Sequence, residues 1–259
     1  MKVQLGSASL NVSQRGKGKP SLLFLHYFGG SSRSWNEVIE LLQADFRCIA
    51  PDARGFGASD STPSGWSVDK SADDLDAVLH ALQLPEARPV ILVGHSMGGK
   101  TALALASRRP DYLRAMVLLA PSPPTPEPME ADERERLMAS HGQTAQIEKT
   151  LRQITARPLP DAIFQRCVED GLRASAPAWR WWLEEGSRED ISARLSQIAV
   201  PVLVVAGAQA TSITAQVLER EVVSRISGAE LEVMPRVRHL LPLEAPEQVA
   251  HLIRRQTLD

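Results

Sequence analysis

Residues 90–100 read Val-Ile-Leu-Val-Gly-His-Ser-Met-Gly-Gly-Lys, and the rest of the expected fold can be built outward from them. The four apolar residues at the start, two of them Val and one Ile, predict a short buried strand. A tight turn follows, with Ser96 between two glycine positions, and the apolar run from Thr101 to Ala106 predicts a buried helix. This order is typical of a nucleophile elbow, a strained strand-to-helix turn that presents a reactive serine.

The same turn provides a place for negative charge. The N-terminus of the predicted helix points at Ser96, so the helix dipole and the backbone N–H of Met97 would stabilise an oxyanion there. A purely structural turn is the alternative interpretation of Gly-x-Ser-x-Gly, because glycine and serine are common residues. The strand before the motif and the helix after it favour the nucleophile.

The composition excludes several classes of protein. Of the 259 residues 43% are hydrophobic, and the net charge is -2, so no strong field would recruit nucleic acid or an anionic membrane. No apolar run approaches the roughly 18 residues of a membrane helix, and the N-terminus lacks a signal-peptide core. The two cysteines, Cys48 and Cys167, do not make a disulfide framework. We therefore expect a cytoplasmic protein, monomeric or homodimeric, without a metal or organic cofactor.

Strand and helix patterns alternate along most of the chain. Apolar residues at a helical period between Ser67 and Leu84 predict one helix, and a capping box at Ser34 and Glu37 predicts an earlier helix through Leu42. The alternation indicates an α/β fold with a mostly parallel eight-stranded sheet and helices on both faces. The expected strands are residues 3–5, 8–14, 21–25, 46–50, 90–93, 115–120, 200–206 and 230–234.

One long segment departs from this alternation. Five prolines between Pro121 and Pro128 exclude a helix or a central strand and predict a stiff exit from the sheet. The pattern that follows, over residues 129–197, is only helical. The sequence therefore predicts an all-helical cap at residues 122–197, inserted between core segments 1–121 and 198–259.

Four separate segments together resemble the α/β-hydrolase family with a helical cap, and the similarity covers essentially the whole chain. They are His-Tyr-Phe-Gly-Gly at 26–30, the glycine-rich loop at 51–59, the elbow at 94–98, and Arg-His-Leu-Leu-Pro-Leu-Glu-Ala-Pro-Glu at 238–247. The resemblance implies that Ser96 is the nucleophile. It also implies that His239, just before the last helix, is the general base.

The oxyanion hole and the pocket follow from the same resemblance. It implies that the backbone N–H groups of Phe28 and Met97 hold the oxyanion. The family usually has glycine where Tyr27 stands, so an aromatic side chain is expected at the pocket. Trp182 of the cap and Leu240 beside the histidine are expected to line the pocket as well.

Other polar residues have structural interpretations. His26 is expected to hold its loop by hydrogen bonds, and His95 to be packed rather than reactive. Asp52 and Arg54 are expected to pair and brace the glycine-rich loop, and His141 in the cap is expected to face solvent.

The third catalytic member, an acid, is missing from its expected place. The family usually carries it in the loop after the strand at 202–206, where Ala210 stands in this chain. Three interpretations remain open: a Ser–His dyad, a remote carboxylate such as Glu127, Glu189 or Asp190, or loss of hydrolysis. In serine proteases, loss of the acid costs roughly 10⁴-fold in turnover and leaves catalysis about 10³ to 10⁴ above water.

The sequence thus predicts a serine hydrolase that acts on a small, mostly apolar ester or lactone. Its alternatives are a ligand-binding or catalytically weakened member of the fold, a carbon–carbon bond hydrolase, and a cofactor-free perhydrolase, because a fold does not determine its chemistry. We expect no nucleic-acid or membrane partner.

Overall fold

The sheet is continuous and mostly parallel. This computed structural model describes every residue except 7, 85–88 and 259, and its strands lie in the order β1-β2-β4-β3-β5-β6-β7-β8. β1 and β2 form an antiparallel hairpin and β2 is antiparallel to β4, whereas the remaining neighbours are parallel. The strands are β1 (Lys2–Leu5), β2 (Ala8–Arg15), β3 (Ser21–Leu25), β4 (Arg47–Pro51), β5 (Val90–His95), β6 (Leu113–Leu119), β7 (Val202–Gly207) and β8 (Glu230–Met234).

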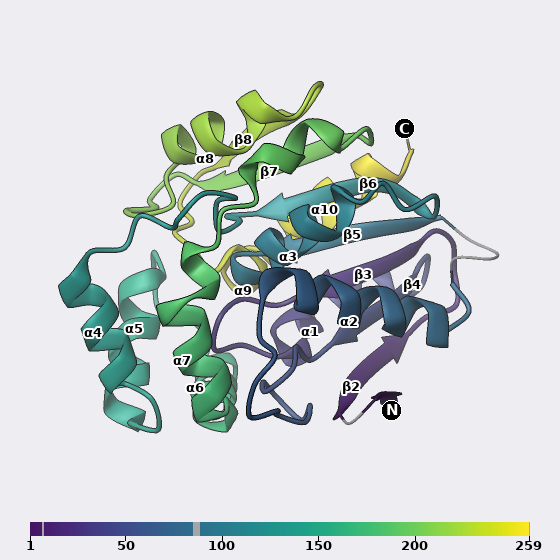
Figure 1. Cartoon of the computed structure of the whole chain (residues 1–259). Helices are drawn as coiled ribbons and strands as arrows, with labels where there is room; N and C mark the ends of the chain where they lie inside the picture. The colour runs from purple at the N-terminus through teal and green to yellow at the C-terminus, as the bar shows by residue number, and fades with distance from the viewer. Residues whose placement is uncertain (7, 85–88, 259) are drawn as a thin grey trace.

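Helices cover both faces of the sheet (Figure 1). One buried cluster joins the sheet to α2, α3 and α8, and a second joins it to α1 and α10. The predicted α/β architecture is confirmed. The helices of the core are α1 (Asn36–Leu42), α2 (Val68–Ala81), α3 (Met97–Ala106), α8 (Ala215–Glu221), α9 (Leu241–Glu244) and α10 (Pro246–Leu258).

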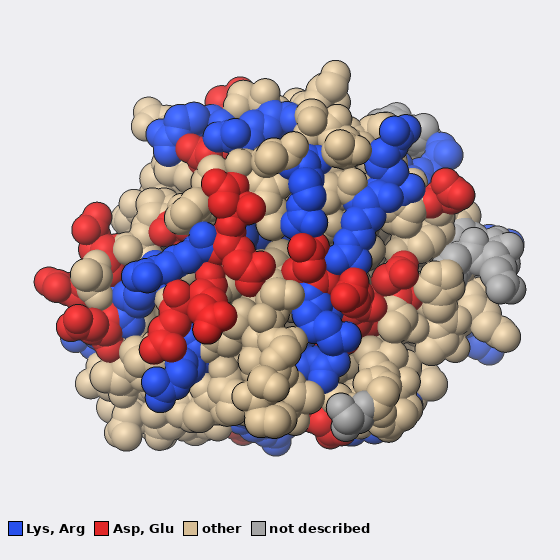
Figure 2. Space-filling view, viewed as in Figure 1, with Lys and Arg blue, Asp and Glu red and all other residues tan. Residues whose placement is uncertain are grey.

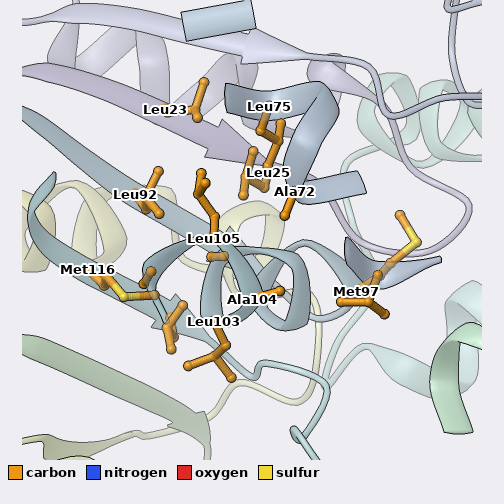
Figure 3. Close-up of a cluster of buried hydrophobic side chains, with 14 of the residues drawn as sticks. Leu23, Leu25, Ala72, Leu75, Leu92, Met97, Leu103, Ala104, Leu105 and Met116 are labelled. Atoms are coloured by element: carbon orange, nitrogen blue, oxygen red, sulfur yellow. The ribbon is translucent and has the colours of Figure 1, made fainter. Parts of the chain in front are cut away.

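The helix after the elbow is buried along its whole length, as its apolar run predicts. Figure 3 shows Leu103 and Leu105 of α3 among side chains of the sheet and of α2, including Leu92 and Leu75. Full burial of one leucine side chain stabilises a fold by about 1.5 to 3 kcal/mol. The element that carries the serine is therefore held firmly between the sheet and its neighbouring helix.

The chain between β6 and β7 consists of helices and loops without a strand. All of residues 122–197 are described and none lies in a strand, so the inserted all-helical cap of the predicted fold is confirmed. Figure 1 shows its helices grouped at one end of the sheet, on the left. The cap contains α4 (Ala131–Ala139), α5 (Thr144–Ile154), α6 (Asp161–Arg173) and α7 (Ala176–Glu184), then 3-10 helices at Gly186–Arg188 and Ser192–Gln197.

The predicted capping box is wrong by three residues. The box is formed by Ser31 and Ser34, whose side chains accept from the backbone N–H groups of Arg33 and Ser31 at the start of a 3-10 helix, Ser32–Trp35. α1 follows without a side-chain cap. The 3-10 turn inserted before the α-helix moves the cap upstream, and a local motif does not reveal that insertion.

The expected pairing of Asp52 with Arg54 is also wrong. Arg54 makes two hydrogen bonds with Asp74 of α2, at 2.7 and 2.8 Å, and both side chains are buried. Asp52 instead accepts from the backbone N–H groups of Ser32 and Ala58. Both residues brace the glycine-rich loop, but through separate partners.

The surface carries charges of both signs. Figure 2 shows Lys and Arg interleaved with Asp and Glu over the described residues of the face in view. Such mixing agrees with the net charge of -2. Within the described ranges, no helix combines the length and the apolar character needed to cross a bilayer.

Candidate active site

The elbow is built as the sequence predicts. Between β5 and α3, Ser96 adopts φ 52° and ψ -118°. Positive φ is strained in a non-glycine residue, and such strain is typical of functional sites. A Cβ atom on Gly94 would lie 2.7 Å from the Cα of Gly99, and one on Gly98 would overlap the carbonyl of Leu25. Both motif glycines are therefore sterically required.

The loop between β8 and α9 brings His239 to the serine. Its Nε2 lies 3.0 Å from Ser96 Oγ, although the two residues are 143 positions apart in the sequence. Burial lowers the pKa of the imidazole from its usual 6.5 to about 4, so the ring is neutral near pH 7. A neutral Nε2 at this distance can accept the serine proton, which is the geometry of a nucleophile and its general base.

The expected acid position lies beside the histidine loop and holds Ala210. The N–H of Gln209 donates to the carbonyl of Val237 at 2.9 Å, and Arg238 Nε donates to the carbonyl of Gln209 at 3.2 Å. Burial alone shifts the pKa of His239, with no carboxylate near enough to raise it. Among the described residues, the serine therefore contacts the histidine, and no carboxylate makes a hydrogen bond with the histidine ring.

The three remote carboxylates considered as substitutes bind other groups. None of them makes a hydrogen bond with His239 in the described chain, so the structure gives no support to a substitute acid. Their partners are the hydroxyl of Ser122 for Glu127 (2.8 Å), the N–H of Val68 for Glu189 (3.0 Å) and the N–H of Ser192 for Asp190 (2.9 Å).

The two expected oxyanion donors are free to bind. Within the described chain, neither the N–H of Phe28 nor that of Met97 donates to another protein group. His26 holds the first of these loops: its Nδ1–H donates to the carbonyl of Tyr27 at 2.8 Å, and its Nε2 accepts from the N–H of Ala53 at 2.9 Å. The structural interpretation of His26 is confirmed. Two unpaired N–H groups near a nucleophile can stabilise developing negative charge.

Aromatic side chains of the cap cover the oxyanion loop. The ring centroid of Phe28 is 4.3 Å from that of Trp179 and 6.4 Å from that of Trp182, which is fully buried. Tyr27 lines a small cavity of about 50 Å³ together with Phe28 and Trp179. Leu240 is buried among cap residues and Tyr27. The pocket roles of Tyr27, Trp182 and Leu240 remain predictions.

A second small cavity, of about 40 Å³, lies beside His26 and Met97. Its walls include His26, Phe56, Met97 and Trp181, and they are mainly apolar. The described residues contain no group of three or more His, Cys, Asp or Glu side chains that could hold a metal ion.

Two polar residues have roles that the sequence analysis missed. Glu244 is buried, and its carboxylate accepts from the N–H groups of Arg238 and Leu240 on either side of the histidine. Only its position five residues after His239 could have indicated this role. His141, expected in solvent, is half-buried, and its Nε2–H donates to the carbonyl of Ala174 at 2.8 Å.

Comparison with known proteins agrees with this geometry. The model of the alpha/beta hydrolase family matches residues 22–252, which include the elbow, the cap and the histidine loop. The chain belongs to this family. As an alpha/beta hydrolase, it shares an architecture with the esterase EaEST from Exiguobacterium antarcticum, at a TM-score of 0.89 and 21% identity over 97% of this chain and 96% of that one.

Two relatives can be aligned with nearly the whole of this chain. It is 30% identical to 3-oxoadipate enol-lactonase 2 of Acinetobacter baylyi, over 95% of this chain and 91% of that relative. It is 29% identical to 2-(acetamidomethylene)succinate hydrolase of Mesorhizobium japonicum, over 95% and 90% respectively. One of these relatives is named a hydrolase and the other an enol-lactonase, so the comparisons support hydrolase function at the level of the family.

Proposed function

We propose that the protein is a serine hydrolase that cleaves a small, mostly apolar ester or lactone through an acyl-enzyme on Ser96. The observation that carries this proposal is the 3.0 Å contact between His239 Nε2 and Ser96 Oγ on a strained elbow. The strain holds the serine in one orientation, and the contact supplies the base that a serine nucleophile needs.

The reaction follows from the positions of these groups. Ser96 Oγ attacks the substrate carbonyl while His239 takes its proton, and the N–H groups of Phe28 and Met97 hold the resulting oxyanion. The imidazolium then gives its proton to the leaving alcohol. Water, deprotonated by His239, attacks the acyl-enzyme and releases the carboxylic acid.

The dyad determines the expected rate. Without a carboxylate, the imidazolium formed during attack has no charged partner at its Nδ1–H, and the ring is not oriented through that atom. In serine proteases, removal of the acid lowers turnover by roughly 10⁴-fold but leaves about 10³ to 10⁴ over water. We therefore infer a slow enzyme with measurable activity.

The surroundings of the two proposed oxyanion donors support an apolar substrate. Phe28 and the cap tryptophans provide aromatic surface, and two small cavities of about 40 and 50 Å³ have Met97 and Phe28, respectively, in their walls, although neither cavity is lined by Ser96 or His239. Mostly apolar walls with few polar groups are usual for small-molecule sites. That one relative is an enol-lactonase supports including lactones.

A fluorophosphonate probe tests the nucleophile. We expect one label per chain in the wild type and none in Ser96→Ala. A matched variant, Ser122→Ala, keeps the nucleophile and should still be labelled. Normal labelling of Ser96→Ala would reject the proposal. Hydrolysis of p-nitrophenyl esters of increasing acyl length then measures the size of the preferred acyl group.

The second candidate is a ligand-binding member of the fold with weakened catalysis. The observation in its favour is that no carboxylate of the described residues makes a hydrogen bond with the imidazole of His239 or raises its pKa. It predicts that substrates or analogues bind while the p-nitrophenyl ester rate of the wild type equals that of Ser96→Ala. A wild-type rate at least tenfold above that of the variant excludes it.

A further inference from the structure

The backbone of His239 is held from three directions. Its carbonyl lies 2.8 Å from His95 Nε2, and its N–H donates to the carbonyl of Ile154 in the cap at 3.0 Å. The N–H groups of the two flanking residues both donate to Glu244. The N–H and the carbonyl of His239 thus have partners on two different elements, α5 and β5, and Glu244 of α9 holds both flanking residues.

His95 has an uncommon arrangement of hydrogen bonds. A carbonyl can only accept, so the proton of His95 must be on Nε2, and Nδ1 carries a bare lone pair. Nδ1 is buried and has no partner in the described chain. Burial and the neighbouring imidazole of His239 hold the pKa of His95 well below its usual value, so the ring is neutral.

The surroundings of His95 would suit an apolar ring. Its centroid is 5.3 Å from that of Tyr27, 6.3 Å from that of Trp35 and 5.3 Å from that of His239. A buried nitrogen without a partner costs free energy, which a phenylalanine here would avoid. What the imidazole adds over an apolar ring is its single bond, Nε2–H to the carbonyl of His239.

We propose that His95 is a positioning residue, which orients the His239 imidazole through the backbone where the family's acid is absent. This inference rests on the proposed Ser96–His239 chemistry. A missing acid leaves the ring free to turn about its side-chain bonds, and its Nε2 has to stay near 3.0 Å from Ser96 Oγ. Fixing the carbonyl holds the backbone from which the ring extends, and a misplacement of 1 Å can cost about 10²-fold in rate.

The bond starts from the elbow itself. His95 is the last residue of β5 and immediately precedes Ser96, so the nucleophile and the donor that holds its base move together. An acid on the β7 loop would orient the ring from a different element. His95 bonds the backbone and does not supply negative charge, so it can compensate for the placement of the base and not for the stabilisation of the imidazolium.

Three variants of one residue separate the hydrogen bond from packing. His95→Phe keeps a ring and removes the donor, and we expect kcat to fall 10- to 100-fold with KM within twofold. His95→Gln places an amide N–H at a reach similar to Nε2 and should recover most of kcat. The side chain of His95→Asn is too short for its amide to reach the carbonyl, so kcat of this variant should be close to that of His95→Phe. Exposed His80 provides the control, since His80→Phe should change neither constant.

A double-mutant cycle that combines His95→Phe with Ala210→Asp provides a measurement that packing would not affect. It compares the loss of kcat caused by His95→Phe in the wild type and in Ala210→Asp. The new carboxylate orients the ring through Nδ1, so we expect the loss from His95→Phe to shrink to less than threefold in that background. An equal loss in both backgrounds overturns the inference, as does a Gln variant no better than Phe. If His95→Phe does not fold, His95→Asn takes its place in the cycle.

The proposed function and this inference fail in different ways. Activity that survives Ser96→Ala rejects the chemistry, whatever the behaviour of His95. Activity that depends on Ser96 but changes less than threefold in both His95→Phe and His95→Asn rejects the positioning role alone.

Discussion

His239 has a low pKa because it is buried without a charged partner, and this property gives a pH prediction. The free enzyme needs a neutral imidazole, and the pKa of the ring is about 4 rather than 6.5. We therefore expect kcat/KM to stay level as the pH falls from 7 to about 5 and to halve near pH 4. The fall of kcat/KM at acid pH is measured with substrates that do not themselves ionise in this range. Half-loss near pH 6.5 would contradict it.

Ala210 is the residue at which a single change should raise activity. Its loop already lies against the histidine loop, so Ala210→Asp brings a carboxylate close to the imidazole. A negative charge there stabilises the imidazolium and orients the ring, and we expect kcat to rise about 10²-fold. The same charge raises the pKa of His239, so the acid limb should move above pH 4.

A matched variant tests this second prediction. Ala208→Asp adds the same charge to the same loop at an exposed position. We expect kcat of this variant to stay within twofold of the wild-type value, because solvent screens exposed charges. Equal gains in both variants would show a general effect of charge, and no gain in Ala210→Asp would reject loss of the acid at this position.

At the scale of elements, a buried lysine joins the nucleophile helix to both ends of the cap. Lys100 of α3 is fully buried, and its Nζ donates to the carbonyls of Thr125 and Ser187 at 3.3 Å. Burial lowers its pKa to about 8, opposed by the attraction of half-buried Glu127, whose own pKa is raised by desolvation of its carboxylate. The outgoing and returning segments of the cap are thus attached to one side chain.

We expect Glu127→Leu to destabilise the protein by about 3 kcal/mol. It leaves Lys100 without the carboxylate that attracts it most strongly and the hydroxyl of Ser122 without an acceptor. Adding Lys100→Met should recover part of the loss, because the two residues interact. Urea unfolding measures each variant, and exposed Glu135→Gln should stay within about 0.5 kcal/mol of the wild type. Strict additivity of the double variant would contradict the coupling.

At the scale of the whole molecule, ion pairs attach the cap to the core on the side of α6. Asp170 of α6 is almost completely buried and accepts from Arg33 Nε at 2.9 Å and from the hydroxyl of Ser31 at 2.8 Å. Arg166 of the same helix pairs with Glu37 of α1. The cap is therefore attached to the core at α6 as well as at Lys100.

Arg33→Ala should be among the most damaging changes outside the site. It leaves a buried carboxylate without its cation, which costs about 3 to 5 kcal/mol. The exposed pair of Arg180 and Glu184 on α7 provides the contrast, since Arg180→Ala should cost no more than about 1 kcal/mol. Chemical denaturation measures the free energy of unfolding of both variants. Similar losses of stability in Arg33→Ala and Arg180→Ala would show that burial of Asp170 does not determine the effect.

Most of the local structure could be predicted from the sequence, because local patterns encode it. The apolar run at 90–93, the glycines around Ser96 and the apolar helix after them follow from sterics and periodicity within a dozen residues. The proline-rich exit and the helical pattern that follows predicted the inserted cap in the same way. The capping box failed because a 3-10 turn separates the motif from α1.

The contacts between distant residues depend on how the elements pack. Arg54 has acidic residues on both sides in the sequence, and the position of α2 selects Asp74. The approach of His239 to Ser96 across 143 residues, like the bond from His95 to the carbonyl of His239, requires the sheet to bring separate loops together. No periodicity encodes such a contact, because its energy comes from the relative placement of whole elements rather than from neighbouring residues.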